Sequence, residues 1–118
     1  QRIALAELYT DRLLDNDNLI VPKREMWAKQ VYHLYVVRVE NPLGVQEYLL
    51  SQGIETGIHY PIAIPKLRAY QNQFDSNEIL NANTLDKHLL SLPIGEHLDA
   101  QDISRVVDCV NEYFLSNE

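Results

Sequence analysis

The chain has 118 residues, a hydrophobic content of 46% and a formal net charge of -7, values that suit one domain with one core. The acidic balance argues against nucleic acid and anionic membranes as partners, because clustered Lys and Arg side chains bind both. The apolar runs are too short to cross a bilayer and no secretory signal is present, so we expect a soluble, cytoplasmic protein. Residues 1–118 are predicted to form a single domain.

Residues 1–14 carry apolar side chains near helical spacing from the start of the chain. No initiating Met and no capping residue precede them, which predicts a partial N-terminal helix and a fragment of a longer protein. A processed or frayed terminus is the alternative. A domain taken from a larger protein should expose an apolar patch, so we expect this helix to expose one and to mediate a dimer.

Two strands and a helix are predicted in the middle of the chain. Residues 31–39 are rich in β-branched and aromatic side chains, which is typical of a buried strand. Pro42 suits the first turn of a helix, and Gly53 suits its left-handed C-terminal cap. Residues 54–58 predict a second short strand, which leads into the polar corner at 59–61.

The second half of the chain begins with a long loop over residues 61–77, with a single helical turn predicted at 67–70. Long ordered loops are often functional. A third helix is predicted over residues 78–89, and residues 91–94 form a brief extended segment.

The last helix has the clearest pattern. Asp99 is placed to cap it, and Asp102 lies in the first turn, where the helix dipole favours negative charge. An apolar stripe follows at helical spacing, made of Ile103, Val106, Val107, Val110 and Phe114. The order of elements predicts an α+β fold, with a small sheet of about three strands and helices packed mainly on one face.

The residue types show no complete catalytic set. The four histidines lack the short spacings of a metal site, so no metal is predicted. Cys109 lies in the apolar stripe of the last helix, which indicates core packing instead of a nucleophile. The four lysines occur in polar or loop surroundings, unlike the desolvated pocket that activates an amine.

His59 and Tyr60 are the candidate functional residues. In one interpretation the pair only closes a strand, with the Tyr60 ring packed under the loop and His59 bonded to backbone. In the other, both side chains face a ligand cleft, where imidazole and phenol bind hydroxyl or phosphate oxygens. The residue chemistry alone leaves both interpretations open.

Three segments in the same order carry a family resemblance, namely residues 32–39, residues 53–62 followed by Ala69-Tyr70, and residues 90–94 before the acidic-capped helix. Together they resemble the C-terminal part of the DegT-type nucleotide-sugar aminotransferases, and the Thr-Gly-Ile-His-Tyr-Pro element is the most specific of them. These are pyridoxal-phosphate enzymes of the aspartate aminotransferase fold. The resemblance implies a small C-terminal domain that covers an active site built mainly by a larger N-terminal domain, in a homodimer.

The resemblance also implies an activity for the longer protein, here called the parent. That activity is transfer of an amino group, usually from glutamate, to a nucleotide-linked keto-sugar, in amino-sugar or cell-surface polysaccharide biosynthesis. Pyridoxal phosphate serves as the electron sink. By family position the aldimine lysine lies upstream of Gln1, so no residue of this chain is predicted to be catalytic. We expect no cofactor bound to this chain alone and no transamination by it.

His59 and Tyr60 match the family element that lines the sugar-nucleotide side of the cleft, which implies that they bind substrate. The chain departs from the family just afterwards. Where members commonly continue with a Pro-Leu-His-type segment, this chain has Ala63-Ile64-Pro65, and the second histidine is absent. A different sugar or a different loop path would account for this. The alternative function is a stand-alone binding or dimerisation module without catalysis, and a regulatory parent is a third reading.

Overall fold

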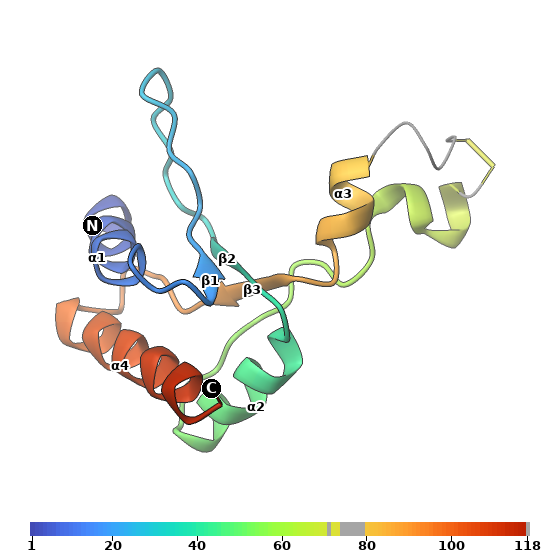
Figure 1. The fold of residues 1–118 in the computed structure, drawn as a ribbon. Helices are drawn as coiled ribbons and strands as arrows, with labels where there is room; N and C mark the ends of the chain where they lie inside the picture. The colour runs from blue at the N-terminus through green and yellow to red at the C-terminus, as the bar shows by residue number, and fades with distance from the viewer. Residues whose placement is uncertain (71, 74–79, 118) are drawn as a thin grey trace.

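The computed structural model describes residues 1–70, 72–73 and 80–117. It has the predicted α+β fold, with three strands and four α-helices in the described part (Figure 1). The elements in chain order are α1 (Arg2–Leu13), β1 (Leu19–Ile20), β2 (Tyr35–Val39), α2 (Pro42–Ser51), the 3-10 turns η1 (Ile64–Lys66) and η2 (Arg68–Tyr70), α3 (Leu80–Leu85), β3 (Leu89–Leu92) and α4 (Ala100–Ser116).

The sheet is antiparallel with the order β1-β2-β3, so β2 is its central strand. Tyr35 pairs with Leu92 and Val37 with Leu90. The side chains of β2 alternate between buried and half-buried, because successive residues of a strand point to opposite faces. Helices α1, α2 and α4 gather on one side of the sheet, and α3 lies beyond its other end (Figure 1).

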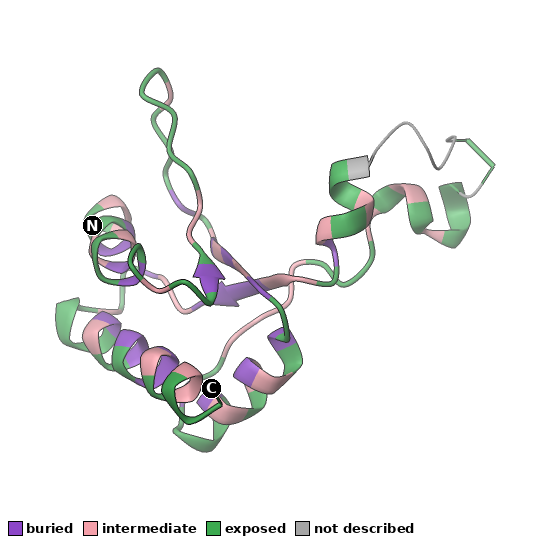
Figure 2. Cartoon of the chain, viewed as in Figure 1, coloured by how far each residue is buried: buried purple, intermediate pink, exposed green. Residues whose placement is uncertain are grey.

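The core lies among the sheet and helices α1, α2 and α4. Four residues of the predicted apolar stripe of α4 are buried, Ile103, Val106, Val107 and Val110, and the fifth, Phe114, is half-buried; Cys109 is buried beside them. Figure 2 shows these buried positions on the side of α4 that faces the rest of the fold. Asp99 and Asp102 each accept a hydrogen bond from the other's backbone N–H, which completes a capping box at the start of the helix.

Helix α1 contributes one face to this core, while Leu14, just after the helix, stays 64% exposed, so an apolar contact surface on residues 1–14 stays a prediction. Its inward side chains are Leu5, Ala6, Tyr9 and Leu13, and all four are buried. The ring of Tyr9 stacks on that of Tyr35, and its hydroxyl donates to the carbonyl of Pro93 at 2.6 Å. No helix among the described residues has the length and apolarity needed to cross a membrane.

Two of the predicted strands are longer than the observed ones, and the extended segment predicted at 91–94 is found earlier in the chain, as β3 at Leu89–Leu92. The strand expected over 31–39 begins only at Tyr35, because Tyr32 has a φ of 54°, in the left-handed region that an extended strand excludes. The strand expected over 54–58 reduces to one bridge between Gly57 and Ser91. The predicted cap at Gly53 is confirmed by its φ of 78°.

The helix expected over residues 78–89 is shorter than predicted. Within the described residues it spans Leu80–Leu85, and positions 78–79 lie outside them. The turn expected at 67–70 is found as η2, and η1 precedes it. The rest of the predicted loop, at position 71 and beyond position 73, also lies outside the described residues.

Two segments project from the compact half of the fold (Figure 1). One is the arm formed by residues 21–34, at whose tip Met26 is 100% and Trp27 85% exposed. The other carries η1, η2 and α3. They raise the radius of gyration to 15.4 Å, where a compact domain of this length would have about 13.5 Å. The site described next lies at the base of the second projection.

Candidate functional site

The site is built on a single antiparallel bridge between Gly57 and Ser91. The N–H of Gly57 donates to the carbonyl of Ser91 at 3.0 Å, and the N–H of Ser91 donates back at 2.7 Å. Side chains of two residues paired in this way stand on the same face. Gly57 has no side chain there, and the imidazole of His59 fills that space. A Cβ placed on Gly57 would lie 2.4 Å from the Cε1 atom of His59.

Ser91 holds the imidazole of His59 from the opposite strand. Its Oγ lies 2.9 Å from Nδ1 of His59, within hydrogen-bond distance. Ser91 is only 4% exposed and is flanked on β3 by the buried Leu90 and Leu92. The histidine is therefore bound to a buried side chain and not to backbone, unlike the strand-closing interpretation.

Tyr60 lies at the surface beside His59. It is 71% exposed, so its ring does not pack under the loop as the strand-closing interpretation requires. Its ring meets that of His59 edge to face, with centroids 5.3 Å apart. The peptide bond that joins the two residues is cis. The structure thus places both predicted site residues together, with a half-buried imidazole and an exposed phenol.

A buried carboxylate fixes the chain just after this pair. Asp86 is 6% exposed and accepts a hydrogen bond from the N–H of Ala63 at 2.9 Å. It also forms an ion pair with Lys66, whose Nζ lies 3.0 Å from Oδ2 of Asp86. The backbone N–H of Ala63, with Lys66 adding to it, lowers the pKa of Asp86 against the opposing effect of burial. The start of the loop is therefore tied to the segment between α3 and β3.

A cavity of about 290 Å³ adjoins the pair on this side. Its walls are mostly apolar in area, and they carry Glu40, Asp86 and Lys87 as charged groups. Ile58 and Pro61, the residues on either side of His59-Tyr60, both line it. The His59-Tyr60 pair thus adjoins a mostly apolar cavity with a few polar groups, which is the usual composition of a small-molecule site.

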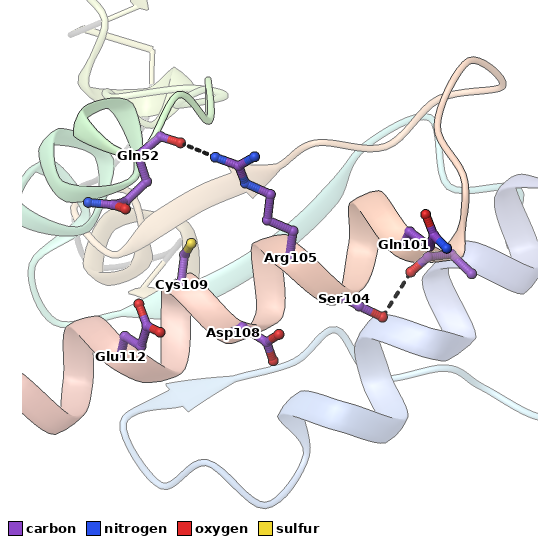
Figure 3. Close-up of a pocket in the computed structure, with 8 residues that line it drawn as sticks. Gln52, Gln101, Ser104, Arg105, Asp108, Cys109 and Glu112 are labelled. Carbon is purple, nitrogen blue, oxygen red and sulfur yellow. Dashed lines mark hydrogen bonds between the residues drawn. The ribbon is translucent and has the colours of Figure 1, made fainter.

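A second hollow, of about 560 Å³, runs along α4 beside the end of α2 (Figure 3). Arg105 spans it and donates to the carbonyl of Gln52 at 2.7 Å, and Cys109 lies at its edge. Burial raises the pKa of the Cys109 thiol, which disfavours the reactive thiolate. Together with its burial, this confirms the core-packing interpretation of Cys109.

The remaining histidines are separate from this site. His33 is exposed in the bend before β2, His88 contacts the carbonyl of Val39 at 3.1 Å through Nδ1, and His97 is exposed between β3 and α4. In the described part of the chain, no three His, Cys, Asp or Glu side chains gather in a way that would hold a metal ion.

Comparison with known proteins places the sequence in a family. The model of the DegT/DnrJ/EryC1/StrS aminotransferase family matches residues 1–111. The chain belongs to this family. The crystal structure of DesV from S. venezuelae, in complex with a ketimine intermediate, superposes on 95% of the chain with a TM-score of 0.86 and 32% identity.

Two relatives show what fraction of a full-length protein this chain matches. The dTDP-3-amino-3,4,6-trideoxy-alpha-D-glucose transaminase of Streptomyces venezuelae is 32% identical over 96% of the chain, which is 30% of that relative. The erythromycin biosynthesis sensory transduction protein EryC1 of Saccharopolyspora erythraea is 33% identical over 91% of the chain, again 30% of the relative. The chain thus spans about 30% of the length of each of these two relatives.

The residues of this chain do not supply an aldimine lysine for pyridoxal phosphate. Such a lysine must be desolvated and free of a fixed carboxylate partner. Lys66 is held by the Asp86 carboxylate and by the carbonyl of Asn83. The other three lysines, at positions 23, 29 and 87, are exposed. None of the four lysines therefore has the surroundings of an aldimine lysine in this structure.

Two contacts of the site were not predicted from the sequence. Ser91 was part of the family resemblance, but its bond to His59 joins residues 32 positions apart. Its only sequence signal is a polar residue between Leu90 and Leu92 on a buried strand. Asp86 was assigned to the predicted third helix, and nothing in the spacing indicated its bond to Ala63.

Proposed function

We propose that this chain is the substrate-covering small domain of a pyridoxal-phosphate-dependent aminotransferase. The parent transfers an amino group, from glutamate, to a nucleotide-linked keto-sugar in amino-sugar or polysaccharide biosynthesis. The observation that carries the proposal is the His59-Tyr60 corner, which is fixed by Gly57, Ser91 and Asp86 yet faces outward. Family membership and the 30% coverage of the transaminase relative support it.

In this proposal His59 and Tyr60 bind the substrate and do not perform the chemistry. The imidazole and the phenol supply two neighbouring polar groups, suited to hydroxyl or phosphoryl oxygens of a sugar nucleotide. The apolar cavity beside Ile58 and Pro61 excludes water from one side of the bound sugar. The cofactor, which supplies the electron sink when bound, is held by the larger N-terminal part of the parent.

The proposed parent is a homodimer. Among the described residues, both projections expose large apolar side chains, at Met26, Trp27 and Val31 on the arm and at Tyr60, Ile62 and Ile64 on the loop, and others, such as Leu14, are exposed elsewhere. Large exposed apolar residues mark surfaces that another part of a protein covers. We assign these two projections to contacts with the N-terminal part and the second protomer, and the predicted contact through residues 1–14 remains open.

The second candidate is a module that keeps the fold without catalysis, or the corresponding part of a regulatory protein. The names of two relatives support this second candidate. EryC1 is named a sensory transduction protein, and a relative from Geobacillus stearothermophilus, 28% identical, is named a pleiotropic regulatory protein. The reading frame upstream of Gln1 separates the two. About 250 further residues containing an aldimine lysine support the enzyme, whereas a natural start near Gln1 supports the module.

The direct test compares this chain with the parent after incubation with pyridoxal phosphate. The parent should show aldimine absorbance and transfer an amino group from glutamate to at least one of a panel of nucleotide-linked keto-sugars. The isolated chain should show neither. Aldimine absorbance or amino transfer by the isolated chain would contradict the assignment of the reactive centre to the rest of the parent.

A further inference from the structure

Ser91 is placed to select which nitrogen of His59 carries the proton. Ser91 is a buried residue of β3. Among the described residues, its hydroxyl has one hydrogen-bond partner, Nδ1 of His59, 2.9 Å away. A hydroxyl carries one proton, which it must donate, and lone pairs with which it accepts. In a buried position the proton needs an acceptor, since an unsatisfied donor is costly there.

Only one tautomer of neutral His59 satisfies that requirement. With the proton on Nε2, the Nδ1 lone pair accepts from the Ser91 hydroxyl. With the proton on Nδ1, the imidazole would donate to Oγ, and the Ser91 proton would be left without an acceptor among the described residues. The burial of Ser91 therefore favours the tautomer with the proton on Nε2.

The other contacts of the ring do not make this choice. Gly57 lies against the imidazole near Cε1, which fixes the position of the ring. Tyr60 meets it at an interplanar angle of 88°, an aromatic contact without a proton to share. Neither contact distinguishes a ring nitrogen that donates from one that accepts. Ser91 is the contact that does.

We propose that Ser91 is a positioning residue that donates to Nδ1 and fixes neutral His59 as the tautomer with its proton on Nε2. The site then offers an N–H donor, so the ligand group it binds is an acceptor oxygen, such as a phosphoryl, keto or ether oxygen. This identification of the ligand group rests on the proposed function. The tautomer itself does not, because the bond to Ser91 is internal to this chain.

Long-range 1H–15N correlation spectroscopy of the isolated chain, recorded in alkaline buffer, reads the tautomer of a neutral imidazole directly. His59→Asn identifies the His59 signals among those of the four histidines. We expect the Nε2–H tautomer to dominate in the unmodified chain. In Ser91→Ala the populations should move toward a mixture, and Ser91→Thr, which keeps the hydroxyl, should restore the dominant form.

Ser51→Ala is the matched control, because the Ser51 hydroxyl is exposed and donates to the carbonyl of Tyr48. It should leave the His59 signals unchanged. A dominant Nδ1–H tautomer in the unmodified chain would overturn the proposal even if no Ser91 variant folds. Unchanged populations in Ser91→Ala would overturn it as well. Since no ligand is present, neither result depends on the sugar-nucleotide assignment.

Discussion

The imidazole of His59 occupies the place of a side chain at Gly57, two residues before it in the sequence. A glycine is needed at position 57 because it leaves room for the imidazole. Its backbone angles do not require a glycine, because its φ lies outside the left-handed region. The glycine of the Thr-Gly-Ile-His-Tyr-Pro element thus has a packing role. It lets His59 fold back onto the bridge and reach Ser91 on the neighbouring strand.

A double-mutant cycle tests this relationship. Gly57→Ala should lower the free energy of unfolding by about 1–3 kcal/mol, because the new methyl group forces the imidazole from its place. In a His59→Ala background the same substitution should cost close to nothing, since all three atoms nearest to that methyl belong to His59. Chemical unfolding of the four proteins measures both costs. Equal costs in the two backgrounds would show that the imidazole is not the obstacle.

Acid should release the loop from Asp86. The pKa of Asp86 is lowered in the folded chain, so the carboxylate stabilises the fold above its unfolded pKa, and this contribution is lost as the pH falls through the lower folded value. The protection factor of the Ala63 amide against hydrogen exchange should therefore fall on acidification from about pH 6 to about pH 3. The measurement is NMR-detected exchange, corrected for intrinsic rates.

The chain contains a matched control for this experiment. The amide of Gly44 donates to the side-chain oxygen of Asn41 at 3.1 Å, an acceptor that does not titrate. Its protection should change less than that of Ala63 over the same pH range. Asp86→Asn should remove the pH dependence at Ala63. Protection of Ala63 that stays constant in the unmodified chain would show that Asp86 does not hold the loop.

Removal of the capping box should weaken α4. Asp99→Ala should reduce the free energy of unfolding by about 1 kcal/mol, because the backbone N–H of Asp102 loses its acceptor. Glu96→Ala, an exposed acidic residue just before the helix, controls for the change in charge and should cost less. Urea unfolding midpoints give the comparison. A similar loss in both variants would assign the effect to charge and not to capping.

Trp27 reports on the arm, because it is the single tryptophan of the chain. At 85% exposure it should emit like indole in water and be quenched readily by acrylamide. Both properties are measured by fluorescence spectroscopy of the isolated chain at low concentration. Shielded emission from a protein that sediments as a monomer would show that the arm folds back on the domain.

Sequence reasoning succeeded where the pattern is local. The spacing of apolar residues on α4, the cap at Asp99 and the left-handed Gly53 each depend on neighbours within one or two helical turns, and all three are confirmed. The apolar face of α1 was missed, because Tyr9 packs on Tyr35, a partner 26 residues away. Spacing within one helix does not show which side a distant strand will cover.

The site was only half predictable for the same reason. His59 and Tyr60 stood out through their residue types and the family element. The groups that hold them, Ser91 and Asp86, contact residues 59 and 63 from 32 and 23 positions away. Asp86 in particular looked like an ordinary polar residue of the predicted helix, and its burial follows only from the loop that folds over it.

The parent enzyme gives the most direct test of the central claim, that the His59-Tyr60 corner binds the sugar nucleotide. In the parent, His59→Ala should raise KM for the nucleotide-linked keto-sugar about tenfold, the effect of about 1.4 kcal/mol from one lost hydrogen bond. The half-reaction with glutamate, which does not use the sugar, should keep its rate. An unchanged KM for the sugar in both His59→Ala and Tyr60→Phe would contradict the account.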